Sequence, residues 1–291
     1  MCRILSALFT AALASMISTP LACAEPPPGI ARFVVAAQRF QELQAAAEAN
    51  HTMPRLTDPE AGSSGPHEVA DLLATLSDAD SLFGTASYDG MDFPVMLDVC
   101  GKGQQIAINY EMNGVASVSA EKIFALHRQN LVTFQDEAVP IMAFSLRCWA
   151  RMLPAMADFE SHLPLSEWAD SRNGLLTARL GIEIAISNGI MIIDAGSYPI
   201  KPQLQAQMAS ALADTACGFE GKMLAEQRKS ILAMAEKVTP PLEPLELKPA
   251  LERLISAMSR TDCEEQCQAL TWQLLHIHRL PMYAPGNRSA H

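Results

Sequence analysis

The feature that most constrains the fold of this chain is the helical spacing of its apolar residues. Just after three prolines at 26–28, apolar side chains recur every three or four positions, as Ile30, Phe33, Val34, Ala37, Phe40 and Leu43. This period is typical of an amphipathic helix with one face against a core. Similar patterns predict helices over 67–76, 119–162, 202–218, 222–238, 249–260 and 262–280, and after Ser166. We therefore predict a mainly α-helical fold, a multi-helix bundle or stacked helical hairpins.

Prolines divide this helical pattern. Pro140 and Pro154 lie inside the 119–162 segment, and each removes a backbone N–H from the helix, so we expect that segment to be split or kinked. A proline-rich stretch at 239–249 is expected to be a stiff connector ahead of the last helices.

Residues 181–194, GIEIAISNGIMIID, fit two structures. Ile182, Ile184 and Ile186 alternate before Asn188-Gly189, which is a strong hairpin signal. In a helix, Leu175, Ile182, Ile186, Ile190 and Ile193 form one stripe, with Gly189 costing about 1 kcal/mol relative to Ala. We favour the helix because a lone hairpin is marginal in water and no other segment is a convincing strand partner. A single β-hairpin over 182–193 remains the alternative.

The first 24 residues have the layout of a secretory signal peptide. Arg3 precedes an apolar run from Ile4 to Ile17, which is too short to span a bilayer, and Ala22-Cys23-Ala24 offers a cleavage site. A lipid anchor on Cys23 is the alternative, although Pro20 stands where lipoprotein signals usually carry leucine. We expect an exported, periplasmic protein with a signal over 1–24, one mostly helical domain over 25–283 and a frayed tail over 284–291, and no membrane span.

The charge balance excludes several classes of partner. The chain has 32 acidic residues against 21 basic ones, a net charge of −11, and removal of the signal with Arg3 makes it one unit more negative. Such a chain repels phosphate backbones and anionic membrane surfaces, so we expect no nucleic-acid partner. A basic protein partner is compatible with this charge.

Five cysteines follow the predicted signal, namely Cys100, Cys148, Cys217, Cys263 and Cys267. In an oxidising compartment an odd number predicts two disulfides and one free thiol, so we expect a disulfide-stapled fold. The spacing of these cysteines along the sequence does not determine which of them form disulfides with one another. Cys217, at the end of a predicted helix, is our first choice of partner for Cys263 or Cys267, and a bridge between these last two is also sterically conceivable.

The stretch 261–280, TDCEEQCQALTWQLLHIHRL, suggests a metal site at first sight. Thr261 and Glu264 form a capping box that predicts a helix start at Asp262. On that helix Cys263 and Cys267 continue the apolar stripe of Leu270, Leu274 and Ile277. His276 and His278 point to nearly opposite sides and do not converge on one ion. We therefore expect neither a metal nor a cofactor.

Catalytic motifs are absent. The chain has no Gly-x-Ser-x-Gly, no His-Glu-x-x-His, no Cys-x-x-Cys and no phosphate-binding glycine loop. The CGKGQQ stretch at 100–105 is interpreted as the end of an element. Cys148 lies between Arg147 and Arg151, which favour a thiolate, but its apolar surroundings predict a buried or bridged cysteine.

Two pairs of charged residues are weaker candidates. Asp158 and His162 are four residues apart and share a helix face, which fits a solvated ion pair better than half of a metal site. Asp136 and Glu137 are adjacent, point about 100° apart on a helix and are expected at the surface.

Residues 77–103 are rich in glycine, aspartate and aromatic residues, and we predict that they are mainly loop. Phe83, Tyr88, Asp89, Asp92 and Phe93 combine aromatic rings with acids, a composition suited to binding a partner. The alternative is that the aromatic rings pin the loop to the core.

These observations favour an exported, non-enzymatic protein-binding protein, most simply an inhibitor or immunity-type protein that neutralises a secreted toxin or enzyme. One alternative is a periplasmic enzyme or thiol redox factor centred on the free thiol or on Asp158 and His162. A metal-handling protein is the second alternative.

Overall fold

The computed structural model describes residues 28–48, 52–57, 68–84, 88–164, 166–194, 196, 198–219, 223–241 and 244–260. These residues form ten α-helices and no strand: α2 (Pro28–Glu48), α3 (Glu68–Ser77), α4 (Ala79–Phe83), α5 (Phe93–Glu111), α6 (Ile123–Thr133), α7 (Gln135–His162), α8 (Trp168–Ile193), α9 (Pro202–Phe219), α10 (Ala225–Ala235) and α11 (Leu247–Ser259). Short 3-10 turns at Val115–Ser117 and Ala120–Lys122 connect α5 to α6. The mainly α-helical prediction is confirmed. The predicted signal peptide, the helix over 262–280 and the tail lie outside the described residues.

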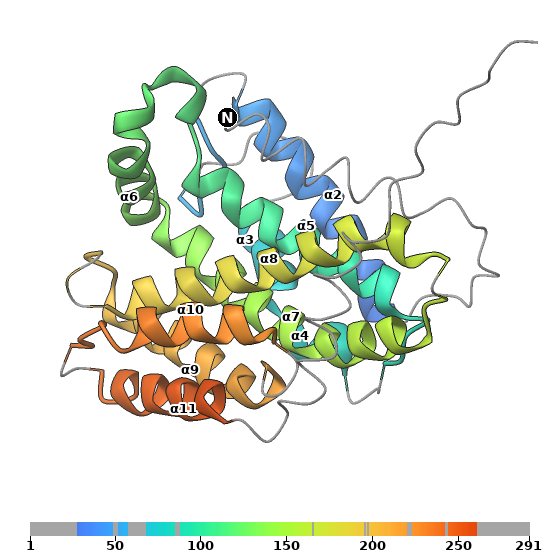
Figure 1. Ribbon diagram of the computed structural model, residues 1–291. Coiled ribbons are helices and arrows are strands. Elements are labelled where there is room, and N and C mark those ends of the chain that lie inside the picture. Colours follow the sequence, from blue (N-terminus) through green and yellow to red (C-terminus); the bar gives the residue numbers. More distant parts are fainter. Residues whose placement is uncertain are drawn as a thin grey trace, which may run out of the picture.

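Helix α7 is the centre of the core. Its side chains are buried along most of its length, and it packs against α5 on one side and α9 on another. Helices α2 and α3 complete the body next to α5 and α7, whereas α10 and α11 cover α8 and α9 at the other end of the molecule (Figure 1). Helix α6 projects at the edge of this body, on the path from α5 to α7.

The expected break in the 119–162 segment occurs, but not at the prolines. Helix α6 ends at Thr133 and α7 begins at Gln135, with Phe134 between them at φ −107° and ψ 21°. Pro140 and Pro154 both lie within the single helix α7, so they do not split the segment, and the alternative that they kink it stays a prediction. Burial of α7 on several sides outweighs the hydrogen bonds that the prolines remove.

The β-hairpin alternative is also wrong, because residues 182–193 belong to helix α8. The stripe of Leu175, Ile182, Ile186, Ile190 and Ile193 is fully buried, as the helical interpretation requires. At Gly189 an added Cβ would lie 3.1 Å from Leu146 of α7 and 3.1 Å from Leu212 of α9. This glycine therefore permits a close approach of three helices and does not make a turn.

Residues 77–103 are mostly helical, so the prediction of a loop is wrong there. Asp78 accepts a hydrogen bond from the backbone N–H of Ser81 at 2.9 Å and caps α4. A proline in the first turn suits the start of α5. The CGKGQQ stretch is interior to α5, not an element end: a Cβ on Gly103 would lie 2.7 Å from the ring of Phe144, so glycine serves close packing of α5 on α7.

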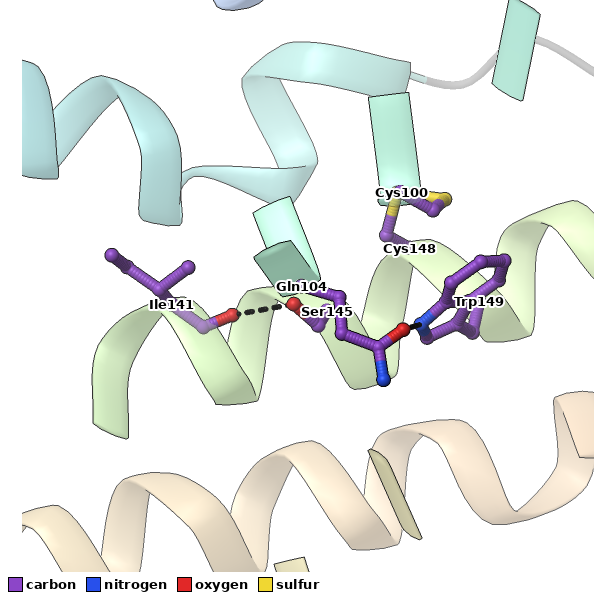
Figure 2. Close-up of a disulfide and its surroundings, with 6 residues drawn as sticks. All are labelled: Cys100, Gln104, Ile141, Ser145, Cys148 and Trp149. Atoms are coloured by element: carbon purple, nitrogen blue, oxygen red, sulfur yellow. Dashed lines mark hydrogen bonds between the residues drawn. A yellow bond between two sulfur atoms is a disulfide. The ribbon is translucent and has the colours of Figure 1, made fainter. Parts of the chain in front are cut away.

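A disulfide between Cys100 of α5 and Cys148 of α7 joins the two helices inside the core (Figure 2). Both residues are fully buried, which confirms the prediction of a bridged Cys148. Beside the disulfide, the side-chain oxygen of Gln104 accepts a hydrogen bond from Trp149 Nε1 at 3.0 Å, and its amide donates to the carbonyl of Gly181 at 3.0 Å. Helices α5, α7 and α8 are thus connected by one satisfied polar network in an apolar core.

The remaining cysteine predictions concern other parts of the chain. Cys217 lies near the end of α9, and its proposed partners Cys263 and Cys267 lie outside the described residues. That second disulfide stays a prediction.

Candidate functional site: two faces at opposite ends of α5

The aromatic residues predicted to bind a partner lie in the core. Phe83 and Phe93 are almost completely buried, and Tyr88 is half-buried. The Tyr88 hydroxyl donates a hydrogen bond to the carbonyl of Phe83 at 3.0 Å, and the two rings pack edge to face at 5.6 Å. Burial raises the pKa of Tyr88 above 10.0, and the charge of Asp92 adds to this. These aromatic rings therefore hold the turn before α5 against the core.

The acids predicted at this site shape the same turn. The backbone N–H of Met91 donates to the Asp89 carboxylate at 2.8 Å, and the N–H of Asp89 donates to the Asp92 carboxylate at 3.0 Å. The N–H of Gly90 donates to Asp158 of α7 at 2.7 Å. A Cβ on Gly90 would lie 2.8 Å from the backbone nitrogen of Phe159, so only glycine permits this approach to α7.

Two apolar side chains at this turn and at the start of α5 are exposed to solvent. Met91 is 67% exposed and Val95, one helical turn further on, is 44% exposed. Asp89 and Asp92 belong to the same turn, and Asp98 follows on α5, where it pairs with Lys102. We call Met91, Val95, Asp89, Asp92 and Asp98 the acidic–apolar face. Sequence reasoning found two of its acids but missed Met91 and Val95, because it did not recognise the start of α5.

Asp158 and His162 lie side by side on the exposed surface of α7, as expected from their spacing of four residues. The Nδ1 of His162 lies 3.3 Å from Asp158 Oδ1, and the two side chains are 77% and 43% exposed. The other carboxylate oxygen of Asp158 holds Gly90. Within the described residues no group of three or more His, Cys, Asp or Glu side chains could hold a metal ion.

The expectation that Asp136 and Glu137 are both at the surface is half wrong. Asp136 is exposed and pairs with Lys201 at 2.6 Å. Glu137 is 1% exposed and accepts hydrogen bonds from Arg55 Nε at 3.2 Å and from the backbone N–H of Leu56 at 2.9 Å. Adjacent residues on a helix point about 100° apart, so one faces water while the other faces the core.

A polar cluster that sequence reasoning missed lies at the C-terminal end of α5, where α6, α8 and the segment before α9 meet. The buried carboxylate of Glu111 lies 2.9 Å from His127 Nε2 and accepts from the Asn188 amide at 3.2 Å. His127 Nδ1 lies 3.3 Å from the Tyr198 hydroxyl. Since a carboxylate only accepts, Nε2 carries a proton, and in the neutral imidazole Nδ1 accepts from Tyr198.

The same end of α5 is capped by α6. The Asn130 amide donates to the carbonyls of Glu111 and Asn113, at 3.0 and 2.7 Å. Burial raises the pKa of Tyr198 above 10.0, and the charge of Glu111 raises it further, so the phenol stays protonated at neutral pH. The chain of contacts from Glu111 through His127 to Tyr198 can orient the proton of the imidazole. It also attaches α6, through His127, to the end of α5.

The outer part of α6 carries a second exposed surface. Phe124 is 87% exposed and shares a helix face with Arg128, whose guanidinium carbon lies 5.9 Å from the centroid of the Tyr198 ring. Helix α6 contains no acidic residue, although exposed Glu121 precedes it. We call Phe124, Arg128 and Tyr198 the aromatic–basic face. Tyr198 is 70 residues from Arg128 in sequence, and Phe124 alone gave no signal.

Among the described residues, one helix is long and apolar enough to cross a membrane, α8 over Asp170–Ile193. More than half of that window is buried against other helices. Arg179, within it, forms a buried ion pair with Glu160 of α7 at 2.6 Å. A core helix of a globular domain meets the same criterion of length and composition.

In comparisons with known proteins, no protein-family model, no curated protein and no solved structure matches this chain.

Proposed function

We propose that this is an exported, non-enzymatic protein-binding protein that captures a basic partner through its acidic–apolar face. The observation that carries the proposal is the exposure of Met91 and Val95 on a turn and helix start that also carry Asp89, Asp92 and Asp98. An apolar centre with a charged rim is the usual composition of a protein interface. The net charge of −11 steers a basic partner toward the protein.

Support for export comes from the N-terminal pattern together with the buried Cys100–Cys148 disulfide, because structural disulfides persist in oxidising compartments. In the periplasm, an inhibitor or immunity-type protein that neutralises a secreted toxin or enzyme fits these properties.

This function is tested by comparing the proteins that the wild type and two variants capture from a periplasmic extract. The chain from Glu25 is immobilised as wild type, as Met91→Asp and as Val35→Asp, where Val35 is a 69% exposed control on α2. The proposal expects one basic protein on the wild type and on the control, released by salt and lost with Met91→Asp. Equal capture by Met91→Asp, or capture of no basic protein at low salt, would contradict it.

The polar cluster favours a second candidate, an enzyme in which His127 acts as a general base oriented by Glu111. Cys148 is bridged and buried and so does not supply the thiol of the redox alternative, which stays a prediction for the other cysteines. Hydrolysis of p-nitrophenyl acetate is the first assay, with Tyr198→Phe and His127→Gln as variants. Activity that both variants reduce supports an enzyme, and equal rates in all three proteins oppose it.

A further inference from the structure

The acidic–apolar face and the aromatic–basic face are chemically complementary. The first presents exposed Met91 and Val95 among aspartates, and the second presents exposed Phe124 beside Arg128. A methionine thioether packs favourably against an aromatic ring, and an arginine pairs with carboxylates. Phe124 at 87% exposure is the most exposed large apolar side chain among the described residues.

The two faces lie at opposite ends of α5. Met91 precedes the first residue of this helix, whereas His127 contacts Glu111, its last residue, and the Tyr198 hydroxyl contacts His127. A helix of 19 residues spans about 28 Å. One molecule therefore has no means of bringing its own two faces together, but two molecules do.

We propose that the aromatic–basic face of one copy docks on the acidic–apolar face of a second copy. Phe124 lies between Met91 and Val95 of that copy, and Arg128 pairs with its aspartates. The contact is heterologous, since each copy contributes a different face, so the assembly either closes on itself or grows as a chain. Both faces are small, and the association is weak.

This inference shares one face with the proposed function and rests on that face being a binding surface. Self-association occupies the acidic–apolar face when the partner is absent, and a basic partner competes with the second copy for it. Self-association and partner binding can be tested separately, because Phe124 takes part only in self-association, whereas Met91 takes part in both.

Analytical ultracentrifugation of three variants and one mixture tests the inference. Wild type is expected to increase in average mass across roughly 1 μM to 1 mM, the Kd range of weak interfaces, and less so at high salt. Met91→Asp and Phe124→Asp are each expected to stay monomeric, with unchanged circular dichroism. The Val35→Asp control is expected to behave as wild type.

The equimolar mixture of Met91→Asp and Phe124→Asp gives the decisive result. Each variant keeps the face that the other has lost, so the mixture is expected to form a dimer that neither variant forms alone. A monomeric wild type, a variant that associates normally, or a mixture that stays monomeric would each overturn the inference. Phe124→Asp is expected to retain capture of the basic partner, so loss of self-association alone leaves the proposed function standing.

Discussion

Helices α7 and α6 are neighbours in the chain but are held in the molecule by different forces. Helix α7 is buried along most of its 28 residues and is cross-linked to α5 by the Cys100–Cys148 disulfide. Helix α6 has 11 residues, of which only Asn130 and Leu131 are buried, and hydrogen bonds from Asn130 and His127 attach it to the end of α5. Apolar burial thus stabilises the body, whereas polar contacts position a helix whose outer side remains exposed.

The contrast between the two helices indicates where this chain can form a recognition surface. A residue on α7 that faces the core contributes to folding, and its replacement destabilises the whole domain. A residue on the outer side of α6, such as Phe124, contributes little to folding and is available to a partner. Substitutions in the core are therefore expected to have larger effects on stability than substitutions on the outer side of α6.

The largest effect is expected from breaking the buried ion pair between α7 and α8. Glu160 and Arg179 are 0% and 2% exposed, and Glu160→Ala leaves a buried guanidinium without its carboxylate. We expect the free energy of unfolding to fall by about 3–5 kcal/mol in urea denaturation. The double variant Glu160→Leu/Arg179→Met is the control and is expected to recover most of the loss. A single variant as stable as wild type would show that this part of the core tolerates the charge.

Removal of the disulfide is the next largest effect. The double variant Cys100→Ser/Cys148→Ser is expected to lower the free energy of unfolding by about 2–5 kcal/mol, because it releases a constraint across 48 residues of the unfolded chain. Chemical denaturation compares it with reduced wild type. If both unfold at the same denaturant concentration as the oxidised protein, the disulfide does not stabilise the body.

A smaller and local effect is expected at α6. Asn130→Ala leaves the carbonyls of Glu111 and Asn113 without their donor, at a cost of about 1–3 kcal/mol. We expect the backbone amides of α6 to exchange hydrogen faster while those of α7 keep their protection. Equal acceleration in both helices would mean that α6 is an integral part of the core.

Phe124→Ser, on the same helix, is expected to change the free energy of unfolding by no more than about 0.5 kcal/mol.

The smallest effect concerns alkaline pH. The folded-state pKa values of Tyr88 and Tyr198 are raised above 10.0, chiefly by burial. A group with a raised pKa contributes stability that is present below its unfolded pKa and is lost as pH rises through the folded value. We therefore expect both phenols to ionise later than free tyrosine, and stability to decline above about pH 10. Tyrosinate absorbance of Tyr88→Phe and Tyr198→Phe assigns the two steps, and ionisation at the ordinary pH would contradict their burial.

Most of the fold could be predicted from sequence because helical periodicity is local. The stripe from Leu175 to Ile193 correctly favoured a helix over a hairpin, since burial of five isoleucine and leucine side chains outweighs one turn signal. Residues 77–103 were misread because Gly90 and Gly103 resemble loop residues. Each of them serves a close approach to α7, which is a tertiary property with no local signature.

The candidate site was predicted much less well. Asp89 and Asp92 were recognised by composition, but the exposure of Met91 depends on which way the start of α5 faces. Glu111, His127 and Tyr198 come from three segments and meet only after folding. Glu137 was misplaced because its burial depends on Arg55 and Leu56, more than 80 residues away.

Native-state hydrogen exchange of the wild type tests the contrast between α7 and α6 most directly. We expect amides in the middle of α7 to exchange only through global unfolding, whereas those of α6 exchange through a local opening with a lower free energy and little dependence on denaturant. Amides of α6 that are as protected as those of α7, with the same denaturant dependence, would contradict it.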